Sequence, residues 1–295
     1  MMHEKGGLAL LAEQYDVFLL DLDGVVYIGR NPLPGAKETI ERLRKEGKQV
    51  YFVTNDPVPT RSQIARRLQD MGIAAQVDEI VSCGWATAQY LRNEGIKSAY
   101  LLGSEGLKRE LEQEGISVLE GHSVACDRQH DVAKNHGHGL RQDRATVDAV
   151  VVGWNEKISF QDIQQAARLI NQGARFIATN ADTSFPAPEG PLPATGAIVK
   201  AIEVTVDQTA TIVGKPFPLM FKTVTDQLSS DLRAVMIGDN PDTDILGAHQ
   251  AGLPAFLIAE QKNSPPVQQD EDVPANIRRP DAILSGLADL YRPLS

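Results

Sequence analysis

Short apolar runs rich in β-branched residues alternate along this chain with longer segments of helical periodicity. Each run is followed by a polar residue at the point where a strand would end, and several helical segments close with a glycine, as helix C-termini commonly do. The runs lie at 17–20, 49–53, 149–153, 175–178, 211–214 and 234–238, and the helical segments at 37–47, 61–72, 160–173 and 243–252. This alternation predicts an α/β fold, in which helices cover both faces of a doubly wound, Rossmann-like parallel sheet.

The polar residues that follow the runs are candidates for one shared site, because such sheets bind ligands outside the carboxyl ends of their strands. Taken one at a time, Asp, Thr and Asn after a strand are also the residues that cap the next helix. Capping does not explain Lys215 after the run 211–214, nor the pair Asp21 and Asp23 after the first run. Together these positions favour a functional site over a set of helix caps.

The charge and composition of the chain limit its partners. Its 295 residues carry a formal net charge of −10, which disfavours nucleic acid and anionic membrane surfaces as partners. Aromatic residues make up 5%, too few for a platform that stacks nucleic-acid bases. No apolar run approaches the roughly 20 residues of a membrane span, and residues 1–24 lack the pattern of a signal peptide. Cys83 and Cys126 suggest no disulfide framework, so we expect a cytoplasmic protein.

Two acidic segments follow predicted buried strands and can supply a metal site. Asp21 and Asp23 stand at i and i+2 in DLDGVVY (21–27), a spacing that directs both carboxylates to one side of a strand. The second segment, GDNPDTD (238–244), contributes Asp239. Carboxylates this close need a counter-cation, and Mg²⁺ prefers oxygen ligands of this kind. The sequence therefore predicts a Mg²⁺ site at these positions.

The other residues at the strand ends supply what phosphoryl transfer needs. Lys215 and Mg²⁺ can neutralise charge on phosphoryl oxygens, and Thr54 and Asn55 can hold one of those oxygens. One carboxylate of the pair Asp21 and Asp23 can attack phosphorus and form an aspartyl-phosphate. The other can protonate the leaving oxygen and then activate water. The residues by themselves leave open which carboxylate has which role.

Four motifs, in this order, resemble those of the haloacid dehalogenase superfamily: DLDGVVY (21–27), VTN (53–55), GKP (214–216) and GDNPDTD (238–244). The chain is most similar to the NagD-like and p-nitrophenylphosphatase-like branch, because 177–203 resembles the segment that returns from cap to core there. The resemblance covers nearly the whole chain outside 120–147. It implies a Mg²⁺-dependent phosphoric monoester hydrolase that acts on small phosphorylated metabolites.

The resemblance also assigns roles to the matching positions. It makes Asp21 the nucleophile, Asp23 the general acid and base, and Lys215 the residue that stabilises the charge of the reacting phosphoryl group. Thr54 would bind phosphoryl oxygens, with Asn55 beside it. The Mg²⁺ ligands implied are Asp21, the backbone carbonyl of Asp23, and Asp239, with Asp244 behind them to orient the ligands.

The spacing of the motifs predicts an inserted domain. Only one helix fits between the first and second motifs, whereas the interval between the second and third is far longer than a strand–helix–strand connection needs. We therefore expect a core formed by 1–83 and 189–295, and an α/β cap at 84–188. Such a cap would exclude bulk water and contact the leaving group. Caps of this type often offer a dimer surface, so a homodimer through the cap is a further expectation.

Three residues of the cap are candidates for contacts to the substrate. Lys157 follows a predicted strand and could meet an anionic or polyol tail, although an exposed lysine is the alternative. Asn180 and Asp182 follow another strand and could serve as turn or helix caps instead. The chain departs from the family at Asn180-Ala181-Asp182 and at 56–59, so the resemblance does not fix these contacts.

One polar, irregular stretch invites a different interpretation. It concentrates side chains that can bind zinc, namely His122, Cys126, His130, His136 and His138. Their spacing fits no compact zinc pattern, so we expect histidines of a surface loop.

Two other functions compete with the phosphatase. A dehalogenase of the same superfamily is disfavoured by Asp23, because a departing halide needs no proton. A protein that binds phosphorylated ligands without turnover is disfavoured because every expected catalytic position is filled. The sequence does not name the phosphate monoester.

Overall fold

The computed structural model describes residues 10–120, 147–185, 189–259 and 275–292. The histidines and the cysteine at 122–138 lie outside the described residues. None of the helices in the described ranges is both long and apolar enough to cross a membrane.

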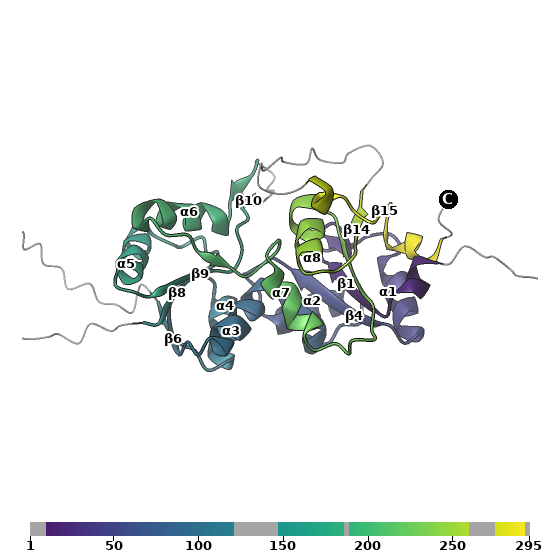
Figure 1. The fold of residues 1–295 in the computed structure, drawn as a ribbon, viewed down its shortest axis with the longest axis horizontal. Coiled ribbons are helices and arrows are strands. Elements are labelled where there is room, and N and C mark those ends of the chain that lie inside the picture. The colour runs from purple at the N-terminus through teal and green to yellow at the C-terminus, as the bar shows by residue number, and fades with distance from the viewer. Residues whose placement is uncertain (1–9, 121–146, 186–188, 260–274, 293–295) are drawn as a thin grey trace, which may run out of the picture.

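A six-stranded parallel sheet forms the half of the molecule on the right of Figure 1, in the spatial order β15–β14–β13–β1–β4–β5. Its strands are β1 (Val17–Asp21), β4 (Gln49–Thr54), β5 (Ile80–Ser82), β13 (Ala234–Gly238), β14 (Ala255–Ile258) and β15 (Ala282–Leu284). The central strand β1 is buried along its whole length, as its apolar run predicts. We use the name core for this sheet and the helices on it.

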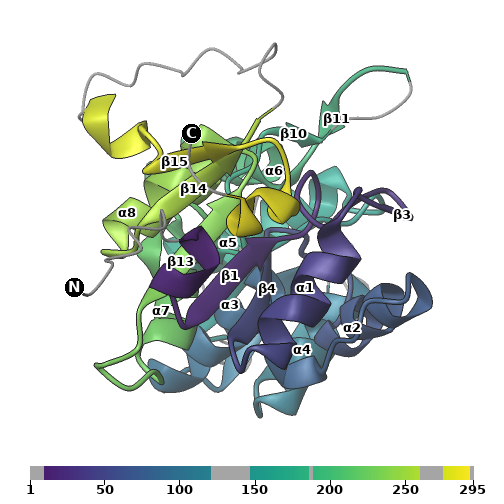
Figure 2. The ribbon, with the colours of Figure 1, turned by 90° about the vertical axis from the view of Figure 1, so that its right-hand side faces the viewer.

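Helices cover both faces of the core sheet because its strands are apolar on both sides. Phe18 and Leu20 of β1 pack with one set of helices, and Val17 and Leu19 pack with the other, as the alternation of strand side chains requires. The first set holds α1 (Ala36–Lys45), α2 (Arg61–Asp70) and two 3₁₀ helices (Leu11–Gln14 and Leu287–Tyr291). Figure 2 shows α1 lying in front of the sheet near β1 and β4. The second set holds α3 (Cys83–Asn93), α7 (Pro218–Thr225) and α8 (Leu246–Gln250).

A second parallel sheet, on the left of Figure 1, has the order β12–β9–β8–β6–β7. Its strands are β6 (Ser98–Leu102), β7 (Ser117–Glu120), β8 (Ala149–Val152), β9 (Arg175–Ala178) and β12 (Thr211–Ile212). Helices α3 and α4 (Glu105–Gln113) pack on one face, and α5 (Phe160–Asn171) and α6 (Thr195–Val206) pack on the other. We use the name cap for this sheet and the helices on it; β12, past residue 188, joins the sheet through β9.

Short elements complete the described chain. Two antiparallel hairpins are formed by β2 (Tyr27–Ile28) with β3 (Asn31–Pro32) and by β10 (Ser184–Phe185) with β11 (Leu192–Pro193). A π-helical turn (Pro241–Ile245) and two 3₁₀ helices (Val77–Glu79 and Ala275–Arg278) account for the rest. The prediction of a doubly wound α/β fold is confirmed.

Candidate active site

The carboxyl ends of the strands in both sheets border one cavity of about 900 Å³. Core strands β1, β4 and β13 end at it, and so do cap strands β8 and β9. The predicted site residues found in its lining are Asp21, Asp23, Thr54, Asn55, Asn180, Asp182, Lys215, Asp239 and Asp244. Lys157 is not in the lining: its side chain is exposed, and its backbone N–H donates to Asn155 Oδ1 in the turn after β8.

Lys215 lies at the centre of a buried ionic cluster. Its Nζ is 2.5 Å from Asp21 Oδ1 and 2.6 Å from Asp244 Oδ1, and only 3% of the residue is exposed. Burial alone would lower the pKa of Lys215, but the two carboxylates outweigh it and the pKa rises. The side chain therefore stays an ammonium that holds the Asp21 carboxylate in place.

Negative charge exceeds positive charge in this cluster. Oxygen atoms of Asp21, Asp239 and Asp244 lie within 4.8 Å of one another, with the one ammonium of Lys215 among them. Burial raises the pKa of Asp21 well above its usual range, although Lys215 opposes the shift. Burial and the charge of Asp244 raise the pKa of Asp239 to about 6. A divalent cation would relieve this excess, and three carboxylates suit the oxygen preference of Mg²⁺.

The backbone geometry around the cluster depends on one glycine. Gly24 has φ +83°, and a Cβ there would lie 2.0 Å from Asp239 Oδ2. A larger residue would therefore displace the Asp239 carboxylate from its present position. Both carboxylate oxygens of Asp244 are engaged, Oδ1 with Lys215 and Oδ2 with the backbone N–H of Asn240 at 3.1 Å. That pattern suits a residue that orients the cluster.

Asp23 differs from Asp21 because its side chain is open to the cavity. Partial burial raises its pKa, the nearby carboxylate of Asp56 adds to the shift, and Arg67 opposes it. A carboxyl group whose pKa is raised stays protonated to higher pH, and in that protonated form it can donate a proton to a leaving group. The asymmetry between the two carboxylates supports the roles that the family resemblance implies for them.

The amide groups expected to contact substrate are bonded within the protein. Asn55 and the backbone of Lys215 bond reciprocally, with Lys215 N–H donating to Asn55 Oδ1 and Asn55 Nδ2 donating to the Lys215 carbonyl, each at 2.9 Å. Asn55 Nδ2 also donates to Asp182 Oδ2 at 3.1 Å, and Asn180 Nδ2 donates to the Asn55 carbonyl at 2.6 Å. These bonds join the end of β4 to the cap and to the backbone of Lys215.

Sequence reasoning missed an aromatic wall on the cap side of the cavity. The rings of Trp154 and Phe185 meet edge to face, with centroids 5.4 Å apart and an interplanar angle of 89°. The indole N–H of Trp154 donates to the carbonyl of Pro193 at 3.0 Å, which fixes the ring against the β10–β11 hairpin. Trp154 directly follows the apolar run 149–153, and that position is the signal that could have revealed it.

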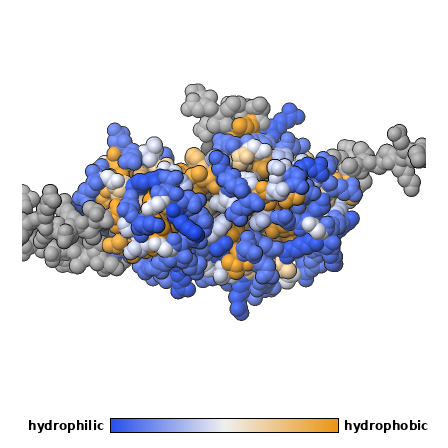
Figure 3. Space-filling model, turned by 60° about the horizontal axis from the view of Figure 1, so that its bottom comes forward, coloured by the Kyte–Doolittle hydropathy of each residue, from blue (hydrophilic) through white to orange (hydrophobic). Residues whose placement is uncertain are grey.

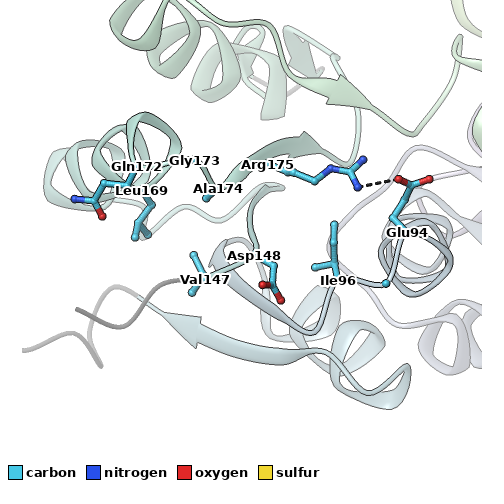
Figure 4. Close-up of a pocket in the computed structure, with 10 residues that line it drawn as sticks. Glu94, Ile96, Val147, Asp148, Leu169, Gln172, Gly173, Ala174 and Arg175 are labelled. Atoms are coloured by element: carbon cyan, nitrogen blue, oxygen red, sulfur yellow. Dashed lines mark hydrogen bonds and ion pairs between the residues drawn. The ribbon is translucent and has the colours of Figure 1, made fainter. Parts of the chain in front are cut away.

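A smaller cavity of about 380 Å³ lies at the opposite end of the cap sheet, where β6, β8 and β9 begin (Figure 4). Its charged groups have partners in the cap. Arg175 bonds to Glu94 at 2.8 Å and to the Tyr90 hydroxyl at 2.7 Å, and Asp148 accepts the backbone N–H groups of Lys97 and Ser98. The larger cavity is therefore the candidate active site.

Comparison with known proteins places this geometry in a family. A model described as haloacid dehalogenase-like hydrolase matches residues 18–117, and a second model of similar description matches residues 212–290. The acid sugar phosphatase of Staphylococcus aureus (strain USA300) is 31% identical over 272 residues, which cover 88% of this chain and 96% of that protein. The chain belongs to the haloacid dehalogenase-like hydrolases. The resemblance deduced from the four motifs is thus confirmed.

Solved structures of this family agree. The glycerol phosphate phosphatase of Mycobacterium tuberculosis, solved in complex with magnesium, matches with a TM-score of 0.78 at 27% sequence identity. The match covers 97% of this chain and 79% of the phosphatase chain. The p-nitrophenyl phosphatase of Archaeoglobus fulgidus has a TM-score of 0.76 at 27% identity and covers 95% of this chain and 99% of its own. The predictions of a haloacid dehalogenase-like phosphatase and of Mg²⁺ as its cofactor are confirmed.

Proposed function

We propose that this hydrolase cleaves small phosphate monoesters through an aspartyl-phosphate on Asp21. The observation that carries the proposal is the buried contact of Asp21 with Lys215, at the edge of a cavity that also exposes Asp23. A carboxylate held by a fixed ammonium is oriented for attack on phosphorus. The ammonium also stabilises the negative charge of the transition state.

The remaining residues bind phosphate and move the proton. Thr54, buried at the end of β4, faces the same cavity and is proposed to bind a phosphoryl oxygen; its Oγ1 accepts the backbone N–H of Asp56 at 3.1 Å, which leaves the hydroxyl hydrogen to donate. Asp23 gives its proton to the leaving oxygen and then takes one from the attacking water. Asp21, Asp239 and the carbonyl of Asp23 would hold Mg²⁺, which supplies further charge neutralisation of the phosphoryl group.

The test compares the full chain with Asp21→Asn on p-nitrophenyl phosphate, with Mg²⁺ and after chelation. The amide keeps the shape of the carboxylate but is a very poor nucleophile, so turnover should fall by about 10³-fold or more. Asp70→Asn, at an exposed position outside the cavity, is the matched control. Turnover by Asp21→Asn within about tenfold of wild type would reject the covalent role of Asp21. If the wild-type protein binds phosphorylated ligands but turns none of them over, the alternative of a non-catalytic binding protein would be favoured.

The proposal extends to the assembly and location of the protein. The most exposed large apolar side chains on the cap helices are Phe160 (74%) and Val204 (83%), within the described residues. The face in Figure 3 is mainly hydrophilic, with separate apolar areas. A homodimer through the cap would cover some of these exposed apolar side chains. Light scattering of the wild-type protein and of Phe160→Ser would test whether it forms.

We propose a cytoplasmic location because Cys83 is a buried free thiol.

A further inference from the structure

The charges around the cavity are strongly unbalanced. Among its described lining residues Lys215 is the one cation, and its ammonium is already bound to Asp21 and Asp244. Six carboxylates line the same space, belonging to Asp21, Asp23, Asp56, Asp182, Asp239 and Asp244. Bound Mg²⁺ and Lys215 neutralise part of this charge, but a phosphate ester brings two negative charges of its own.

Two further carboxylates of the cavity lining, those of Asp182 and Asp56, have neutral hydrogen-bond donors as partners. Asp182 accepts a hydrogen bond from the neutral amide of Asn55, and Asp56 accepts one from the backbone N–H of Val58. The guanidinium of Arg67 is 3.9 Å from Asp56 Oδ2, but it also bonds the Tyr27 hydroxyl and is not part of the cavity wall. A second anionic group on a substrate would therefore meet carboxylates.

Apolar side chains line another part of the cavity. Trp154 and Phe185 form it on the cap side, and Ile28 and Val58 line the cavity on the core side. Pro193 holds the indole N–H, so the ring of Trp154 is already positioned before a ligand arrives. Flat or ring-shaped neutral groups gain most from such a surface, because aromatic contacts add to the burial of apolar area.

We infer that the preferred substrates are phosphate monoesters whose leaving group is uncharged or cationic and carries a ring, while a carboxylate or a second phosphate on the leaving group is selected against. The inference rests on the proposed function, since it concerns the leaving group of the same reaction. Discrimination of this kind arises as much from repulsion of the wrong ligand as from attraction of the right one.

Three aryl phosphates of equal ring size test the charge preference: phenyl phosphate, 4-carboxyphenyl phosphate and 4-(aminomethyl)phenyl phosphate. In the wild-type protein with Mg²⁺, kcat/KM for the carboxylate ester should be about tenfold or more below that for phenyl phosphate, whereas the ammonium ester should equal or exceed it. The difference should shrink at high salt, since salt screens exposed charges.

Ser184→Lys separates charge from chemical reactivity, because it adds a cation to the wall without altering the esters. Ser184 is exposed in β10 and lines the cavity. The ratio of kcat/KM for carboxyphenyl phosphate to that for phenyl phosphate should rise about tenfold in this variant. Gln161→Lys adds the same charge on exposed α5, outside the lining, and should leave the ratio unchanged.

Trp154→Ala and Phe185→Ala test the apolar wall. Each should lower kcat/KM for phenyl phosphate by about tenfold and affect methyl phosphate much less, while Ile283→Ala, exposed and outside the lining, should affect neither. Equal kcat/KM for the anionic and neutral esters, with no response to Ser184→Lys, would overturn the inference while the phosphatase function stands. Absence of turnover on all three esters would overturn the proposed function and the inference with it.

Discussion

At the scale of single residues, the two carboxylates of the first motif lie in different surroundings. Burial raises the pKa of both, but Asp21 is bound to Lys215 away from solvent, whereas Asp23 is open to the cavity. The difference predicts that Asp23→Asn harms substrates unequally. An alkyl phosphate such as glycerol phosphate needs a proton on its leaving oxygen, so its turnover should fall about 10²–10⁴-fold. Loss on p-nitrophenyl phosphate should be much smaller, because that group leaves without proton assistance.

The measurement is kcat for both esters in wild type and variant at one Mg²⁺ concentration. An unchanged unfolding temperature would show that the variant folds normally. Equal losses on the two esters would contradict the role of Asp23 as an acid.

When Mg²⁺ is removed, the stability of the protein should depend on the protonation of Asp239. Burial raises its pKa to about 6 in the metal-free fold, above its value in the unfolded chain. The folded state therefore binds more protons, so this contribution to stability is complete at low pH and is lost as pH rises through about 6. Mg²⁺ replaces the missing proton. We expect the gain in unfolding temperature from Mg²⁺ over chelator to grow from about pH 5 to about pH 7.5.

Thermal unfolding at the two pH values, with Mg²⁺ or with chelator, measures this gain. Asp239→Asn should flatten its pH dependence, because the amide does not titrate. A gain of equal size at both pH values in the wild-type protein would argue against the titration.

At the scale of elements, helix α4 of the cap packs directly against the loop that follows β4. A Cβ at Gly106, the second residue of α4, would lie 2.1 Å from the carbonyl oxygen of Val58. Ser104 Oγ donates to the same carbonyl at 2.8 Å. Gly106→Ala must therefore push the helix away, and we expect the free energy of unfolding to fall by about 1–3 kcal/mol.

Chemical denaturation of Gly106→Ala beside Gly286→Ala would measure this cost. A Cβ at Gly286 would have nothing within 4 Å of it, and the backbone there is extended, so this substitution should change little. Because Val58 lines the active-site cavity, KM for p-nitrophenyl phosphate should also rise in Gly106→Ala. Equal stability of the two variants would show that α4 has room to move.

That Asp21, Thr54 and Asp239 lie near one another could be predicted from the sequence, because each stands at the end of a parallel strand and parallel strands end at one edge of a sheet. The partners of Asn55 could not, since they lie 127 and 160 residues away along the chain. The pairing of β12 with β9 could not be predicted either, because β12 has only two residues. The position of Lys157 depends on the local turn at Asn155, which leaves Trp154 facing the cavity instead.

At the scale of the whole molecule, core and cap share one hydrophobic cluster. It joins Leu19 and Met236 of the core sheet to Leu101 and Val151 of the cap sheet. Helix α3 connects them, because it packs on α4 of the cap and on α7 of the core. Figure 1 shows α3 and α7 where the two halves meet. Two domains that share a cluster lose apolar contacts in both when either unfolds, so their stabilities are coupled.

This coupling predicts that core and cap unfold together. Calorimetry of the full chain in the presence of chelator should give one transition, with the calorimetric enthalpy equal to the van't Hoff enthalpy. Chelator is needed because Mg²⁺ bound at Asp21 and Asp239 would stabilise the core alone. The buried ion pair of Arg61 in the core with Glu110 of α4, at 3.6 Å, offers a second test. Glu110→Gln should lower that single unfolding temperature without splitting the transition. Two resolved transitions in wild type would mean that the cap folds independently of the shared cluster.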